Sequence, residues 1–210
     1  MGVKMNKRQI SAQNTKKKLI TTALKLIKEK GFDSINVEDI TKASNVAKGT
    51  FYTYFKRKED IVLEISRMPF NDIKDEIALM KNANLYKKLK HYFHRFMEQV
   101  EFCGIQVCRE WIKNVIDPNK VPENLDDKKW FYDFEMLKNI LEDAIKNKEL
   151  KKDTKIELLA HIIICELYGM MICWCMSDGK FEPLDWTDKF CEAQLDKIFE
   201  PYFNKQKGIK

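Results

Sequence analysis

Apolar residues recur along this chain at intervals of three and four positions, which is the spacing of amphipathic helices. No stretch shows the strict alternation of apolar and polar residues that indicates a half-buried strand. The pattern predicts helices over residues 15–30, 37–44, 48–55, 58–82, 85–102, 105–116, 126–147, 154–177 and 187–203. Pro69 is expected to kink or break the fourth helix, because proline removes a backbone donor and clashes with the preceding turn. The chain is therefore predicted to be all-α.

The first three predicted helices are separated by clear turn signals. Gly31 follows the first helix, at a position where a residue with positive φ commonly ends a helix. Asn36 and Asp39 have the spacing of a capping box at the start of the second helix. Asn45 is expected to form the corner after it, because asparagine tolerates the left-handed backbone region. Ala43 is expected to be buried with the apolar residues of the second helix.

The third predicted helix carries small, polar and aromatic side chains on its outer positions. Phe51 and Phe55 lie one turn apart and are expected to form its buried edge. The outer positions hold Lys48, Thr50, Tyr52 and Tyr54, and a basic run follows at residues 56–58. A short helix of this kind, flanked by positive charge, suits insertion into the major groove of DNA. The sequence therefore predicts sequence-specific DNA binding.

Each of these outer residues also has an ordinary structural interpretation. Tyr52 can pack against the first helix, although Phe51 and Phe55 already fill that side. Thr50 can act as a local cap, and Lys48 can be a solvated lysine. DNA contact is the favoured interpretation for the tyrosine and the threonine, whereas the two interpretations of the lysine are balanced.

The net charge of +6 hides an uneven distribution. Residues 1–58 hold 14 lysines and arginines against 4 acidic residues, and the remainder holds 24 against 28. A basic N-terminal part on a mildly acidic body indicates a polyanionic partner for that part alone. The alternative is a lysine-rich chain whose lysines cover every solvated face.

Six cysteines and one long apolar segment raise the questions of disulfides and of a membrane span. The N-terminal residues are polar and basic, without the apolar segment of a signal peptide, so reduced core thiols in a cytoplasmic protein are predicted. Residues 156–176 are long enough to cross a membrane, but they include Glu157, His161 and Glu166. This segment is therefore predicted to be a buried helix, and no membrane partner is expected.

Two segments carry a resemblance to a known family. They are VEDI at residues 37–40 and VAKGTFYTYFKRKED at residues 46–60, and they follow an amphipathic helix that ends in Gly31 and Phe32. In this pattern the chain resembles the TetR family of bacterial transcriptional regulators. The match covers residues 15–65 directly, and only the length and the helical pattern agree beyond that.

The resemblance implies two domains. Residues 1–60 would form a three-helix helix-turn-helix DNA-binding domain, and residues 61–210 a larger helical domain for effector binding and dimerisation. It also implies a homodimer, formed through the last two helices, that binds a palindromic operator and is released by a small apolar or amphipathic effector.

By position, the resemblance implies three groove-facing residues, phosphate contacts and a glycine that lets the backbone approach the duplex. The expected DNA-binding residues are Val37, Lys48, Gly49, Thr50, Tyr52, Tyr54, Lys56 and Lys58. Two positions depart from the family pattern. Val37 replaces a hydroxyl side chain that could reach a phosphate, and Arg57 replaces a capping side chain ahead of the fourth helix.

The aromatic and methionine content of the C-terminal part suggests an apolar effector cavity with a few polar anchors. The expected lining residues are Phe93, Phe96, Met97, Trp111, Phe131, Phe134, Glu166 and Met170. For any one of these residues taken alone, filling an ordinary core is the slightly better interpretation. The resemblance favours a pocket for the set.

The predicted function is a ligand-responsive transcriptional repressor. The alternative is a nucleoid-associated or assembly protein on the same fold, whose C-terminal domain binds another protein. No enzyme is expected, because the sequence lacks a phosphate loop, a nucleophile elbow and a recognisable catalytic carboxylate pair. No cofactor or metal is expected: His91 and His94 share a helix face without an obvious third ligand, and Cys173 and Cys175 point apart on a helix.

Overall fold

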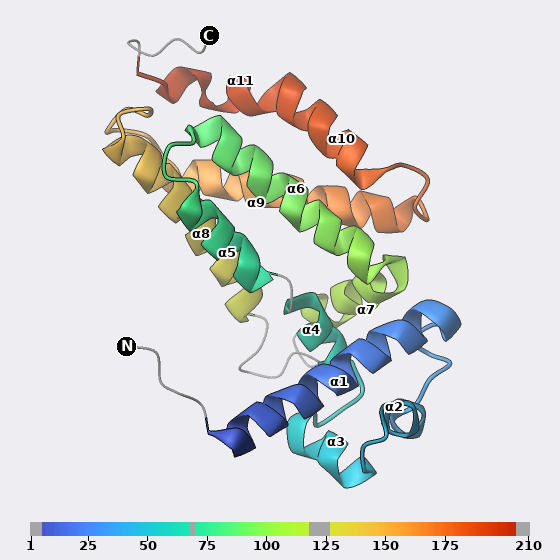
Figure 1. Cartoon of the computed structure of the whole chain (residues 1–210). Coiled ribbons are helices and arrows are strands. Elements are labelled where there is room, and N and C mark those ends of the chain that lie inside the picture. Colours follow the sequence, from blue (N-terminus) through green and yellow to red (C-terminus); the bar gives the residue numbers. More distant parts are fainter. Residues whose placement is uncertain (1–5, 68–69, 118–126, 205–210) are drawn as a thin grey trace. The chain divides into compact units, whose positions relative to one another are not determined.

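The computed structural model describes residues 6–67, 70–117 and 127–204, and its described segments are helical, with one isolated bridge between Leu150 and Phe203 (Figure 1). This confirms the all-α prediction. The helices are α1 (Lys7–Lys30), α2 (Val37–Ser44), α3 (Lys48–Tyr54), α4 (Glu59–Arg67), α5 (Phe70–Leu79), α6 (Leu85–Cys103), α7 (Ile105–Ile116), α8 (Asp127–Lys146), α9 (Ile156–Met176), α10 (Pro183–Phe190) and α11 (Asp196–Phe199).

The chain divides into two compact units. The first comprises Met1–Met68 with Gln106–Lys120, and the second comprises Pro69–Ile105 with Val121–Lys210. The first unit thus includes α4 and most of α7 as well as the three N-terminal helices. The functional division after residue 60 that the sequence suggests stays a prediction.

Helix α1 begins eight residues before its predicted start. Asn6 caps it through a reciprocal pair of hydrogen bonds with Gln9, each 2.9 Å long. The added turns carry no apolar stripe, since the first fully buried residue of the helix is Leu19. Periodicity therefore gave no signal for this segment, and the capping box alone marks where the helix begins.

Helix α2 has its predicted bounds and its predicted caps. Asn36 and Asp39 form the capping box, and Asn45 adopts the left-handed conformation at φ 50°. The expected burial of Ala43 is wrong, because this residue is exposed while Ser44 is fully buried. Ser44 satisfies its hydroxyl inside the helix by donating to the carbonyl of residue 40 at 2.7 Å.

The single helix predicted over residues 58–82 is two helices, α4 and α5, and Pro69 between them lies outside the described residues. At the start of α4 the side chain of Asp60 reaches back to the backbone that precedes the helix. The Oδ2 atom of Asp60 accepts the backbone N–H groups of Lys56 and Arg57, both at 2.9 Å. Asp60 thus supplies the half of a capping box in which an acidic side chain accepts backbone N–H groups ahead of the helix, while Arg57 has no side-chain acceptor for the other half.

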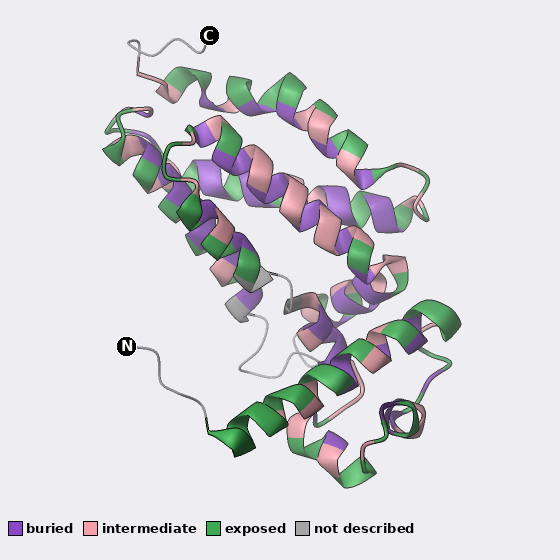
Figure 2. Cartoon of the chain, in the orientation of Figure 1, coloured by how far each residue is buried: buried purple, intermediate pink, exposed green. Residues whose placement is uncertain are grey.

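Helix α6 is the centre of the second unit, where it packs against α5, α8, α9 and α10. Figure 2 shows buried residues recurring along α6 and α9, whereas exposed residues dominate α1. Side chains of α6 such as Leu89, Phe93 and Met97 have no exposed surface. Phe93 stacks on Phe190 of α10, with ring centroids 5.2 Å apart.

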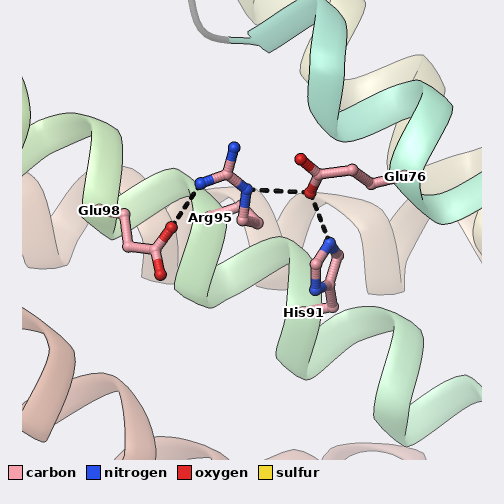
Figure 3. Close-up of polar contacts among 4 residues, drawn as sticks. All are labelled: Glu76, His91, Arg95 and Glu98. Carbon is pink, nitrogen blue, oxygen red and sulfur yellow. Dashed lines mark hydrogen bonds and ion pairs between the residues drawn. The ribbon is translucent and has the colours of Figure 1, made fainter.

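Helices α5 and α6 are joined by a polar network that Figure 3 shows in detail. The Oε2 atom of Glu76 on α5 lies 2.7 Å from His91 Nε2 and accepts a hydrogen bond from Arg95 Nε at 2.9 Å. Arg95 also donates to Glu98 on its own helix. Burial raises the pKa of Glu76, but the hydrogen bonds from Arg95 and His91 outweigh it and hold that pKa below its usual value.

Helix α9 is only partly buried, in contrast to the prediction. It is the one helix in the described residues that is long and apolar enough to cross a membrane, and half of its most apolar window is buried. Its exposed apolar side chains are Leu158, Ile162, Ile172 and Met176. Cys165 and Cys173 are exposed on the same helix, so the expectation of core thiols is wrong for these two and correct for the four buried cysteines.

The last helical segment begins at Pro183, inside the predicted break. Proline occupies the first turn of α10, where its missing N–H has no intrahelical partner to lose. A π-helical stretch at Cys191–Leu195 follows, then α11 and a 3-10 turn at Glu200–Tyr202. Burial raises the pKa of the Cys191 thiol to about 11.

Candidate functional site

Helix α3 buries one edge and exposes the other, as predicted. Phe51 and Phe55 are buried, with ring centroids 5.1 Å apart. Tyr52 is 50% exposed, and its ring meets that of Phe51 edge to face at 5.5 Å. Thr50 and Tyr54 are half-buried. The tyrosine ring is therefore packed against the core on one side and free for contact on the other.

Gly49 has no packing role within the first unit. A Cβ atom built on it meets no heavy atom within 4 Å, and its backbone does not lie in the left-handed region. In a helix, glycine costs about 1 kcal/mol relative to alanine. The fold alone does not require glycine at position 49. A close contact with a binding partner is a reason for glycine at this position.

Lys48 has an acidic partner on the preceding helix. Its ammonium donates a hydrogen bond to Glu38 of α2, and both side chains are about half exposed. This hydrogen bond lowers the pKa of Glu38 and raises the pKa of Lys48. A contact from Lys48 to DNA would have to replace this surface ion pair, which costs little.

Lys58 is tied to the turn that follows α1. Its Nζ atom donates to the carbonyl oxygens of Phe32 and Ile35, each at 2.9 Å, and lies 4.1 Å from the ring centroid of Phe32. The sequence suggested a phosphate contact for this lysine. In the structure its ammonium instead connects the start of α4 to the turn before α2.

The two remaining residues of the expected DNA set differ in exposure. Val37 is buried at the first position of α2, and Lys56 is exposed beyond the end of α3. The expected set therefore gives α3 and its surroundings one exposed tyrosine, lysines that are exposed or half exposed, and a glycine without packing neighbours at its Cβ position. Such a surface can present a stacking or hydrogen-bonding tip together with positive charge to a polyanion.

The residues expected to line an effector cavity are not gathered in one place. Phe96 and Met97 are buried in the core beside Phe93, and Phe96 packs on the ring of Tyr168 at 5.6 Å. Trp111 belongs to the first unit, whereas the others belong to the second. Phe131 is 54% exposed.

The remaining aromatic residue of that set lies in a ring cluster on α8 and α9. Phe134 stacks on Trp130 with centroids 5.1 Å apart, and lies 4.5 Å from the ring of His161. His161 also has its Nδ1 atom 2.8 Å from the carbonyl of Glu157 on its own helix. The histidine is therefore accounted for by packing and by a local hydrogen bond.

A cavity of about 380 Å³, here called the α9 pocket, contains the last two residues of the expected set. It is lined by Glu166, Gly169, Met170, Cys173, Phe181 and Trp186. Burial raises the pKa of Glu166 above its ordinary value. The pocket offers a mostly apolar surface with one carboxylate.

A larger cavity of about 650 Å³, here called the α8 groove, lies among α5, α6 and α8 and contains none of the residues expected from the sequence. It is lined by Lys74, Ile77, Ala78, Lys81, Lys88, Tyr132, Glu135, Met136, Asn139, Ile140, Asp143, Lys146 and Asn147. Lys88 could have been found from the sequence, because it falls within the apolar stripe of α6, three residues after Leu85 and one before Leu89.

A buried charged pair lies inside the second unit and was also missed. Lys129 and Asp133 of α8 are buried and form an ion pair at 2.7 Å. The hydroxyl of Tyr168 donates to the same carboxylate oxygen at 2.7 Å. An acid and a base four residues apart read equally well as a solvated helix face, so the sequence gave no sign of their burial.

No cluster of three or more metal-ligating side chains occurs in the described residues. His91 and His94 contact different carboxylates, those of Glu76 and Asp188. The two histidines therefore take part in separate hydrogen bonds between helices rather than in a shared site.

A family model described as "Bacterial regulatory proteins, tetR family" matches residues 19–65, which span part of α1, all of α2 and α3, and most of α4. Over these residues the chain has the helix-turn-helix segment of the TetR family. The match falls on the helices that carry Tyr52, Gly49 and the basic run. It confirms the resemblance that the sequence carries.

Three relatives show how far TetR-family similarity extends. The uncharacterized HTH-type transcriptional regulator YerO of Bacillus subtilis is 26% identical over 125 residues, which cover 56% of this chain but only 40% of YerO. The fatty acid metabolism regulator protein of the same species is 25% identical over 189 residues, covering 86% of this chain and 93% of that protein. The structure of Thermus thermophilus FadR, a TetR-family transcriptional repressor in complex with lauroyl-CoA, covers 93% of this chain with a TM-score of 0.68 at 16% identity, over 98% of that chain.

The structural relative and the sequence relatives support different statements about this chain. The structural likeness at 16% identity shows that the TetR fold extends over both units. By name, one sequence relative is an HTH-type transcriptional regulator and the other is a regulator of fatty acid metabolism.

Proposed function

We propose that the chain is an effector-responsive transcriptional repressor that acts in the cytoplasm as a homodimer on a palindromic operator. The observation that carries this proposal is the exposed edge of α3, where Tyr52 is half exposed beside a glycine that the fold does not need. The TetR-family match covers this helix.

Docking follows the geometry of helix-turn-helix proteins, with α3 as the recognition helix. Tyr52 and Thr50 supply base-edge contacts, and Lys48, Tyr54 and Lys56 supply contacts to the backbone. Two such helices in a symmetric dimer read half-sites whose centres are about 34–36 Å apart per helical turn, or a multiple of that distance. A palindromic operator mirrors that symmetry.

The exposed apolar face of α9 supports dimerisation. Leu158, Ile162, Ile172 and Met176 are all exposed, with the exposed Cys165 among them. They recur at spacings of three, four and seven, so they form one stripe along the helix. A contiguous apolar stripe of this length on the surface marks an interaction site. We assign it, with the last helical segment, to the seam between two copies of the chain.

The effector is proposed to be an amphipathic acyl thioester. Thermus thermophilus FadR is described in complex with lauroyl-CoA, and a relative covering most of this chain is a fatty acid metabolism regulator. The second unit offers two cavities, one mostly apolar and one lined by lysines. Binding there releases DNA only to the extent that the effector prefers the conformation that does not fit the operator.

The test begins with selection of bound fragments from a random duplex pool, followed by fluorescence anisotropy at fixed salt. Tyr52→Ala is expected to weaken binding to the selected site by about 1–3 kcal/mol, because it removes a base contact. Dimer mass by light scattering is expected to stay unchanged. Thr53→Ala is the matched control, because Thr53 is exposed on the same helix and its hydroxyl donates to the carbonyl of Gly49 within that helix.

Two results contradict the proposal. Unchanged affinity of the Tyr52→Ala variant would remove α3 as the recognition helix. Equal binding to unrelated sequences, without a selected site, would favour a nucleoid-associated or assembly protein instead.

A further inference from the structure

Three lysines of the α8 groove have no acidic partner in the described part of the chain. They are Lys74, Lys81 and Lys88, from α5, the turn after it and α6. The two acidic residues of the groove are already engaged: Glu135 accepts from Lys138 at 2.9 Å, and Asp143 accepts from Lys146 at 3.3 Å. The groove therefore holds positive charge that its own carboxylates do not neutralise.

Lys88 is the most informative of the three. It is only 8% exposed, although it lines the groove, and no ion pair with it occurs among the described residues. Its Nζ atom is not among the buried side-chain nitrogens and oxygens that lack a partner, so the stem is buried while the ammonium group opens onto the groove. A solvated surface lysine explains Lys74 and Lys81, which are exposed, but it does not explain why Lys88 occupies a buried position.

Apart from the three lysines and the ion-paired Glu135, Asp143 and Lys146, the groove is apolar or neutral. Ile77 and Ala78 come from α5, and Met136 and Ile140 come from α8. Its volume of about 650 Å³ lies in the range of small-molecule sites, roughly 300–1,000 Å³. Apolar walls beside unpaired ammonium groups suit a ligand that carries an anionic group and a hydrocarbon portion.

One wall of the groove is firmly held. Glu76 on α5 is bound to His91 and Arg95 on α6, as Figure 3 shows. The neighbouring residues Lys74 and Ile77 line the groove. The network thus holds α5 against α6 through Glu76, while Lys74 and Ile77 of α5 line the groove. The position of Lys74 relative to Lys88 on α6 is therefore set by the packing of these two helices.

We propose that the α8 groove binds the phosphate-bearing part of an amphipathic ligand, with Lys88 as the main anchor and Lys74 and Lys81 as flanking contacts. This rests on the proposed function only in taking the ligand to be the effector. Lysine ammonium groups bind phosphate as point charges, and the buried position of Lys88 strengthens its interaction because solvent screens it less. The apolar walls hold the start of the hydrocarbon chain.

The test measures direct binding by isothermal titration calorimetry to the full chain, without DNA. Palmitoyl-CoA, hexadecyl phosphate, free coenzyme A and palmitate are the probes. Palmitoyl-CoA or hexadecyl phosphate is expected to bind at least tenfold more tightly than palmitate, and whichever of the two binds more tightly identifies the source of the phosphate. Free coenzyme A is expected to compete with the tighter of these two phosphate probes for the groove.

Lys88→Met is expected to weaken binding of the tighter phosphate probe at least tenfold, because methionine keeps the buried stem and removes the charge. Lys74→Met with Lys81→Met changes only exposed side chains, so folding is not at risk, and it is expected to weaken binding and to flatten its salt dependence. Lys152→Met is the matched control, because Lys152 is an exposed lysine outside the groove. The affinity of the Lys152→Met variant for the same phosphate probe is expected to equal that of the unmodified chain.

Three results would overturn the inference: no binding of either phosphate probe, equal binding of palmitate, or unchanged affinity in both lysine variants. Failure of the proposed function is seen separately, in the DNA experiment on Tyr52. If the phosphate probe binds through Lys88 but leaves DNA affinity unchanged, the groove is a binding site and the probe is not the effector.

Discussion

The two units of the molecule differ in how far apart their functional residues lie along the chain. The residues expected to contact DNA all fall between Val37 and Lys58, and the central ones share one seven-residue helix, α3. The α8 groove instead draws on residues from Lys74 to Asn147 and on three helices. A local surface can be read from local spacing, whereas a groove between helices depends on how those helices pack.

The two units also differ in how they use lysine. In the first unit, Lys48 and Lys58 both have partners, a carboxylate and a pair of carbonyl oxygens. In the second unit, Lys88 is buried without a partner among the described residues. A lysine expected to contact DNA can thus stabilise the fold instead, as Lys58 does. A lysine within an apolar stripe can be available for a ligand, as we propose for Lys88.

The largest effect should come from Lys58. Lys58→Met removes two charged hydrogen bonds between the start of α4 and the turn after α1, so it is expected to destabilise the chain by about 1–3 kcal/mol. Urea denaturation measures this change. Lys56→Met, at an exposed neighbouring position, is the control. An unchanged midpoint together with a smaller salt slope of DNA binding would restore the phosphate contact suggested by the sequence.

A smaller effect of opposite sign is expected for Gly49→Ala. The new Cβ meets no atom within 4 Å, so alanine should stabilise α3 by about 0.5–1 kcal/mol. DNA affinity should fall at the same time, because the methyl group holds the backbone away from the duplex. The pair of measurements separates the fold from the interface: if affinity is retained, Gly49 has no role at the DNA.

The smallest effect concerns acid stability in the second unit. The pKa of Glu76 is held below its ordinary value of about 4.5 by Arg95 and His91, in spite of burial. Its stabilising contribution is therefore present above that value and is lost as the pH falls through the lower folded-state pKa. Glu76→Gln should be less stable than the unmodified chain at pH 6, and the difference should shrink below pH 4.5 in thermal denaturation. A difference that persists at low pH would point to packing rather than charge.

The bounds of α2 and the buried edge of α3 could be predicted from the sequence because their signals are local. The capping box at Asn36 and Asp39, the left-handed Asn45 and the buried pair on α3 each depend on residues within a few positions of one another. The early start of α1 was missed because its first turns carry no apolar stripe.

The effector residues expected from composition show the opposite case. Phe93 and Phe131 have the same side chain, yet one is buried in the core and the other is largely exposed. Trp111 is assigned to the other unit altogether. Side-chain type alone does not distinguish a core position from a cavity lining, because both require apolar surface.

The sequence by itself determined the helical class, the TetR-type helix-turn-helix and the outward set on α3, since each depends on short-range periodicity and capping. Only the tertiary structure decided that Lys58 bonds to carbonyl groups of a distant turn, that Asp133 is buried with Lys129, and that Lys88 faces a groove. These three depend on helices separated along the chain coming together. The free energy of such packing depends on many side chains of the core at once, so it cannot be predicted from the residue type at a single position.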